Sequence, residues 1–193
     1  MISVLELHPG DEDVLSRCSS CLASLSCDAA AALQIAEEGG VAAVLASIDA
    51  NPDLDPESVA GGVGMIEAVM SNPAAFSKVA DQDLVDKVVS VMGKHLESPA
   101  ISLSCVRVLE KVAKTAEGLA MIQASGGVKM LLSSLSAAAA RQIHGEEDAD
   151  LVVRATKVLG RVARTSAVIR EMKGGTGVDV YLKVLEAFPE DER

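Results

Sequence analysis

Aromatic side chains are almost absent from this chain of 193 residues, which has no tryptophan, one tyrosine and two phenylalanines. Without aromatic platforms, a protein that stacks nucleic-acid bases or sugar rings is not expected. The charge balance points the same way. There are 28 acidic and 17 basic side chains, for a net charge of −11, and a phosphate backbone repels such a chain. We therefore expect no nucleic-acid partner.

Long apolar runs are missing as well. The longest, around residues 137–140, falls far short of the roughly 20 residues of a membrane-spanning helix, and no secretory leader pattern opens the chain. Yet 49% of the residues are hydrophobic, which is untypical of disordered chains. We expect a cytoplasmic protein without membrane contact, and an association with the cytoskeleton or the nucleus stays open.

Apolar residues recur instead at spacings of three and four along the whole chain, which predicts an all-α fold. The pattern also repeats. Four anchor valines, Val41, Val85, Val128 and Val178, stand 44, 43 and 50 residues apart, and apolar residues occupy the same offsets around each of them. Each unit should contain a long helix, a short helix and a medium helix that begins at the anchor.

Glycines mark the bend before the medium helix. Gly40, Gly127 and Gly177 directly precede their anchors, where a sharp turn calls for a residue that tolerates positive φ. The second unit has Leu84 there instead. The longest interval between anchors predicts an insertion at about residues 137–150, with an exposed loop at 145–148.

These motifs resemble the armadillo repeat family. The similarity lies in EEGGVAAVLASI (37–48), QASGGVKMLLSSL (123–135) and the long-helix pattern RVLEKVA (107–113), and it covers nearly the whole chain. It implies a single right-handed α-solenoid over residues 1–193, with about four repeats of three helices, incomplete at both ends. HEAT repeats, the nearest competitor, have two helices and lack the glycine bend. The expected units are 1–28, 29–72, 73–115, 116–165 and 166–193.

The resemblance also places a ligand groove on the long helices, where armadillo proteins hold an extended peptide with a tryptophan and an asparagine. Neither residue is present at the matching positions of this chain. Those positions are small or polar in the first two units and basic in the next two: Ser20, Ser24, Gly64, Ala68, Arg107, Lys111, Lys157 and Arg161.

Basic residues recur on the last two long helices at helical spacing, so that they share one face. The stripe consists of Arg107, Lys111, Lys114, Arg154, Lys157, Arg161 and Arg164. Because arginine forms bidentate contacts with carboxylates and phosphates, we expect this stripe to bind an extended acidic or phosphorylated segment of another protein. A solvated face balanced by Glu110, Glu117 and the acids at 146–150 is the alternative interpretation.

A second functional class stays open. Both chain ends carry apolar residues without an evident polar cap, Val4 and Leu5 at the start and Leu182 and Leu185 near the end. The chain would then be an architectural subunit that associates with itself, or joins a cytoskeletal or ciliary assembly, through these ends.

Catalytic and metal-binding motifs are not evident. Cys18 and Cys21 have the spacing of half a zinc site, but no second pair completes it, and the repeat register aligns both with buried core positions. The acidic stretch 49–57 has Leu54 where a calcium loop needs glycine, so we expect a helix cap near Asp55 or Ser58 instead. We expect a non-enzymatic protein without metal or cofactor.

Overall fold

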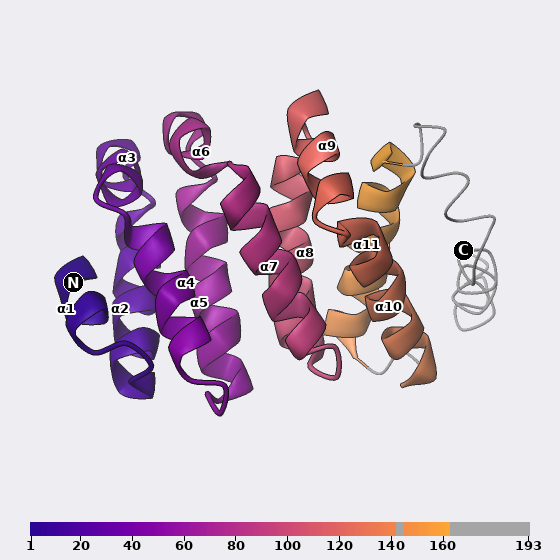
Figure 1. Cartoon of the computed structure of the whole chain (residues 1–193), viewed down its shortest axis with the longest axis horizontal. Coiled ribbons are helices and arrows are strands. Elements are labelled where there is room, and N and C mark those ends of the chain that lie inside the picture. The colour runs from indigo at the N-terminus through magenta and orange to yellow at the C-terminus, as the bar shows by residue number, and fades with distance from the viewer. Residues whose placement is uncertain (142–144, 163–193) are drawn as a thin grey trace.

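The computed structural model describes residues 1–141 and 145–162, which form eleven α-helices and no strand (Figure 1). After α1 (Ile2–Leu7), the helices follow one another in a recurring order of long, short and medium. The long helices are α2 (Glu12–Leu25), α5 (Pro56–Val69), α8 (Pro99–Val112) and α11 (Glu146–Val162). The short ones are α3 (Ala29–Glu37), α6 (Pro73–Val79) and α9 (Ala116–Ala124). The medium ones are α4 (Gly40–Ala50), α7 (Gln82–Lys94) and α10 (Gly127–Ala140).

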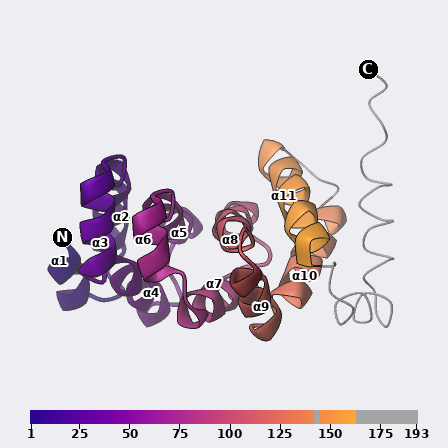
Figure 2. The ribbon, with the colours of Figure 1, turned by 90° about the horizontal axis from the view of Figure 1, so that it is seen from above.

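The long helices pack against one another from unit to unit. α2 contacts α5, α5 contacts α8 and α8 contacts α11, so the long helices form one row that runs along the molecule (Figures 1 and 2). α4, α7 and α10 pack on α5, α8 and α11, respectively. The all-helical architecture predicted from the apolar spacing is confirmed for these residues.

The repeat register identifies the core. The anchors Val41, Val85 and Val128 are at most 5% exposed, while Val178 lies outside the described residues. On the long helices, Ile66 and Leu109 are fully buried at equivalent positions. One apolar cluster therefore runs through all the described units.

The burial predicted from the repeat register does not hold on the side of α2 that faces away from α5. Cys21 and Leu25 are exposed, although their equivalents in α5, Met65 and Val69, are fully buried. The expectation that Cys21 is a core residue is wrong, because α2 has a long helix on one side only in the part of the chain that the structure describes. Cys18, on the side toward the core, is buried as expected.

The glycine bends lie one residue earlier than predicted. Positive φ occurs at Gly39 (77°) and Gly126 (72°), and not at Gly40 or Gly127. The second glycine of each pair is the first residue of the medium helix and must be small, because a Cβ at Gly40 would lie 2.7 Å from the Cγ2 atom of Ile35. Gly177 lies outside the described residues.

The second unit passes from its short to its medium helix without glycine. Asp81 caps α7, and its Oδ1 atom accepts a hydrogen bond from the Leu84 amide at 2.8 Å. A similar cap confirms the prediction for Asp55, whose carboxylate accepts from the Glu57 amide at 2.9 Å at the start of α5. Side-chain caps thus satisfy helix amides that the backbone leaves unpaired.

The expected loop at 145–148 is largely helical. Glu146, Glu147 and Asp148 form the first turn of α11, where the helix dipole favours acidic side chains. Asp148 is only 1% exposed and accepts a hydrogen bond from Arg141 Nη2 at 2.8 Å. The prediction was wrong because an acidic run is typical both of exposed loops and of helix starts.

Within the described ranges, no single helix is long and apolar enough to cross a membrane. Only α3 and α4 taken together meet the criteria of length and composition, and this pair is bent by 59° at its break.

Candidate functional site

Six of the seven predicted cations lie on or next to two neighbouring long helices. Arg107 and Lys111 belong to α8, and Lys114 follows its end. The matching cations of α11 are Arg154, Lys157 and Arg161. Arg164 lies outside the described residues. We call the exposed side of α8 and α11 that carries these side chains, together with the adjoining side of α5, the long-helix face.

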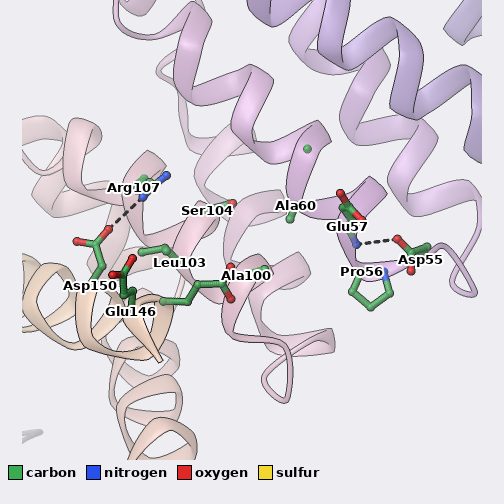
Figure 3. Close-up of a pocket in the computed structure, with 12 residues that line it drawn as sticks. Asp55, Pro56, Glu57, Ala60, Ala100, Leu103, Ser104, Arg107, Glu146 and Asp150 are labelled. Atoms are coloured by element: carbon green, nitrogen blue, oxygen red, sulfur yellow. Dashed lines mark hydrogen bonds and ion pairs between the residues drawn. The ribbon is translucent and has the colours of Figure 1, made fainter. Parts of the chain in front are cut away.

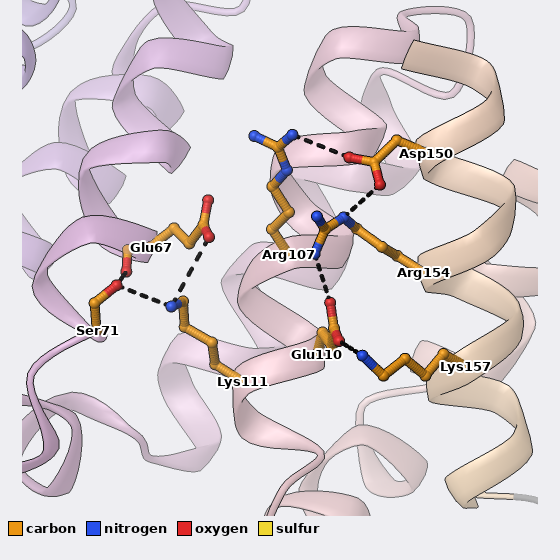
Figure 4. Close-up of polar contacts among 8 residues, drawn as sticks. All are labelled: Glu67, Ser71, Arg107, Glu110, Lys111, Asp150, Arg154 and Lys157. Carbon is orange, nitrogen blue, oxygen red and sulfur yellow. Dashed lines mark hydrogen bonds and ion pairs between the residues drawn. The ribbon is translucent and has the colours of Figure 1, made fainter. Parts of the chain in front are cut away.

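A chain of ion pairs joins α8 to α11 at the centre of this face (Figure 4). Asp150 accepts from Arg107 Nη2 at 3.0 Å and from Arg154 Nε at 2.8 Å. Glu110 accepts from Arg154 Nη1 at 2.8 Å and from Lys157 Nζ. Three of the predicted binding cations are therefore partly neutralised within the protein. We call these five residues the α8–α11 ion-pair chain.

The pKa shifts in this chain reflect competition between burial and hydrogen bonding. Burial, the largest single influence, raises the pKa of Glu110, but hydrogen bonds from Lys157 and Arg154 lower it below its ordinary 4.5. Burial also raises the pKa of Asp150, but hydrogen bonds from Arg154 and Arg107 hold it below the ordinary value of 3.8. The hydrogen bond to Asp150 is the main cause that raises the pKa of Arg154. Glu110, Asp150 and Arg154 are thus charged at neutral pH.

Lys111 connects α8 to the preceding long helix. Its Nζ atom donates to the Ser71 hydroxyl at 2.9 Å and lies 3.8 Å from a carboxylate oxygen of Glu67 (Figure 4). This contact is looser than those in the α8–α11 ion-pair chain, because 3.8 Å exceeds the length of a direct hydrogen bond.

The side chains of Lys114 and Arg161 remain without an ion-pair or hydrogen-bond partner among the residues that the structure describes. Both line a pocket of about 340 Å³ together with Ala113 and Leu119, near the C-terminal ends of α8 and α11. The Nη1 atom of Arg161 is buried there without a hydrogen bond. We call this part of the long-helix face its basic end.

The opposite end of the face is acidic, which the sequence analysis missed. A pocket of about 930 Å³ lies between the first turns of α5, α8 and α11 (Figure 3). Its carboxylates are Asp55, Glu57, Glu146, Glu147 and Asp150. Acidic residues begin α5 and α11, and the sequence pattern alone assigned them to a helix cap and to a loop.

Thiols and metal ligands give no second site in the described residues. Cys18, Cys21, Cys27 and Cys105 are free, and burial raises the pKa of the Cys105 thiol to about 12. Such a thiol is protonated and unreactive at neutral pH. No group of three or more His, Cys, Asp or Glu side chains is placed to hold a metal ion in this part of the chain.

Among the described residues, the long-helix face thus combines an acidic end, a centre neutralised by ion pairs, and a basic end with two unpaired cations. The helix dipole accounts for this polarity, because it favours acidic residues in the first turn of a helix and basic residues in the last. Comparisons of the chain with protein-family models, with curated proteins and with solved structures found no match.

Proposed function

We propose that this protein is a non-catalytic interaction module built as a right-handed armadillo-like solenoid of about four repeats. The recurring order of long, short and medium helices supports this architecture, as does the row formed by α2, α5, α8 and α11. The left-handed glycines at two of the bends are a further support. In such an array, the exposed side of the long helices is available to a ligand.

The ligand in this proposal is an extended acidic or phosphorylated segment of another protein. The observation that carries it is the basic end of the long-helix face, where Lys114 and Arg161 line a pocket and have no partner in the described residues. Binding of an anion there satisfies the buried Nη1 atom of Arg161, and an unpaired buried donor is costly. Lys111 and Lys157 each lie about one helical turn away, before Lys114 and Arg161 respectively.

The two charged ends of the face also fix where the anionic groups bind. Carboxylates around the larger pocket repel an acidic segment from the first turns of α5 and α11. The anionic residues of the ligand therefore bind at the C-terminal ends of α8 and α11. Arg107 and Arg154 mainly hold these two helices together, because both are already paired with carboxylates.

The test uses a fluorescein-labelled peptide of glutamates and one phosphoserine, separated by glycines, and measures its binding by fluorescence anisotropy. The Lys114→Glu, Arg161→Glu double variant should bind at least about tenfold more weakly, as expected for two lost charge-assisted contacts. Lys78→Glu, Lys94→Glu is a control with the same change of charge at the ends of α6 and α7, away from the long-helix face. In the wild type these two lysines pair with Glu37 and Asp49, so circular dichroism checks that this variant stays helical.

Salt provides an independent readout. Affinity for the wild-type protein should fall as ionic strength rises, because exposed charges are screened over about 8 Å at physiological salt. Equal affinity of the double variant and the wild type, or an affinity that salt leaves unchanged, contradicts the groove proposal.

A second candidate function is architectural, with assembly through an open end of the helix row. The observation that favours it is apolar exposure at the N-terminal end, where Leu7 is 74% and Leu25 46% exposed. Leu182 and Leu185, the apolar residues expected at the other end, lie outside the described residues. Light scattering that finds a monomer at high protein concentration contradicts self-assembly.

A further inference from the structure

An apolar surface lies at the N-terminal end of the helix row, on the side of α1 and α2 away from α5. Met1, Val4 and Leu7 are 50%, 42% and 74% exposed, and Leu25 is 46% exposed. Cys21 is exposed one helical turn before Leu25. We call these five residues the N-terminal face. They include four of the five large hydrophobic side chains exposed in the described residues.

The equivalent positions on the other long helices show what kind of element covers such a surface. The positions of α5 that correspond to Cys21 and Leu25 are Met65 and Val69, and both are fully buried. In α8 and α11 the corresponding side chains are fully buried too: Val108, Val112, Val158 and Val162. Each of these helices packs on the long helix before it. The N-terminal face therefore continues an internal interface and has the pattern that fits a helix.

A small pocket lies on the same side, where it can accept a side chain of a bound helix. Its volume is about 180 Å³, which matches a single large apolar side chain better than a small-molecule ligand. The pocket lies between α1, α2 and α3. Its lining residues include Met1, Ile2, Leu22, Leu25, Ile35 and Glu38.

The acidic residues near the N-terminal face indicate which kind of helix can bind there. Residues 1–38 contain seven carboxylates and one basic side chain, Arg17. Two copies of the chain that pair through this face bring two acidic surfaces together, which like-charge repulsion disfavours. A helix with basic residues beside its apolar stripe meets complementary charge instead.

We propose that the N-terminal face binds an amphipathic helix of another protein, with lysines or arginines flanking its apolar stripe. The helix lies against α2 as α2 lies against α5, and one of its apolar side chains enters the pocket beside Leu22 and Leu25. This interaction is separate from ligand binding at the basic end of the long-helix face. The two can therefore fail independently.

Two peptides from this chain serve as probes in a binding assay with the full-length protein. The peptide of residues 98–115, made with Ala for Cys105, is an apolar helix with a net charge of +2. The peptide of residues 55–72 is an apolar helix of equal length with a net charge of −3. The basic peptide should bind, and the acidic peptide should bind at least about tenfold more weakly because of repulsion.

Single substitutions locate the binding site. Leu25→Ser and Val4→Ser should each weaken binding of the basic peptide by about tenfold, the amount that an apolar side chain contributes when it is buried at an interface. Val153→Ser is the matched control, because Val153 is an equally apolar residue, 63% exposed on α11. Circular dichroism checks that each variant remains helical, and the partial exposure of the substituted residues makes that the expected result.

Three outcomes overturn the proposal. They are the absence of binding by the basic peptide, binding that Leu25→Ser and Val4→Ser leave unchanged, and a dimer of the protein that these two variants dissociate in sedimentation equilibrium. The last outcome identifies a second copy as the occupant. The Lys114→Glu, Arg161→Glu variant should bind the peptide as the wild type does, so a failure of the groove proposal is recognised separately.

Discussion

The three junctions between neighbouring long helices are built differently. Apolar side chains hold α2 against α5, and no ion pair joins these two helices in the described structure. Between α5 and α8, a single loose ion pair of Lys111 with Glu67 is added to the apolar packing. The α8–α11 ion-pair chain crosses the third junction. Apolar burial is thus common to all three, and polar contacts are added along the row.

The difference shows what each kind of contact contributes. Apolar burial supplies most of the stability, in proportion to the area removed from water. A partly buried ion pair gains little net free energy, because desolvation of its charges offsets their attraction. Its geometry, however, allows few arrangements, so we infer that the ion-pair chain mainly fixes how α11 lies on α8.

The largest effect should come from the apolar junction. Leu15 of α2 is fully buried, and its Cδ1 atom lies 3.6 Å from the point that a Cβ would occupy at Gly62 of α5. Leu15→Ala should lower the free energy of unfolding by about 3 kcal/mol, because it leaves a cavity between tightly packed helices. Urea unfolding measures the change, and a loss below about 1 kcal/mol shows that this junction is not a main source of stability.

A smaller loss is expected at the polar junction. Glu110→Ala removes the carboxylate shared by Arg154 and Lys157, and should cost about 1 to 2 kcal/mol because both cations keep access to water. Urea unfolding of Glu110→Ala, Arg154→Ala and the double variant gives their coupling energy. If the two single losses add without coupling, the ion-pair chain does not act as a unit.

Acid should weaken the third junction selectively. Because the folded-state pKa values of Glu110 and Asp150 lie below 4.5 and 3.8, their stabilisation is complete above these values. It is lost as the pH falls through the lower, folded-state pKa values. The free energy of unfolding should therefore decrease below pH 4.5 less steeply in Glu110→Gln, Asp150→Asn than in the wild type. Parallel pH profiles contradict the assigned shifts.

The smallest effect is expected at the middle junction. Lys111→Ala removes the 3.8 Å contact with Glu67 and the hydrogen bond to Ser71, and should cost at most about 1 kcal/mol. Thermal unfolding in low and high salt detects this change, which should shrink as salt screens the pair. A loss as large as that of Leu15→Ala would reverse the order of the junctions.

Sequence reasoning predicted the helices well because their apolar periodicity survives in every described unit. It misplaced the positive φ by one residue, since the two glycines of each pair differ only in their surroundings. Gly39 adopts the turn, whereas Gly40 is constrained by Ile35, a contact that requires the folded chain. Cys21 was misjudged because the register assumes a neighbour on both sides of every long helix.

The candidate site was predicted in part. Helical spacing predicts that Arg107, Lys111, Arg154 and Lys157 share one side of the long helices, and Figure 4 shows them beside one another on α8 and α11. It did not assign their partners, because the contacts of Glu110 and Asp150 depend on how far α11 is shifted and rotated relative to α8. Periodicity within one helix carries no information on that offset.

The bends differ in how much mutation they tolerate. Gly39 and Gly126 have φ values that other residues adopt only with strain, so almost any codon change there is penalised. The bend of the second unit relies on the Asp81 cap, which asparagine or serine can replace at little cost. Over generations, therefore, the middle of the array is where its sequence can drift while its shape stays constant.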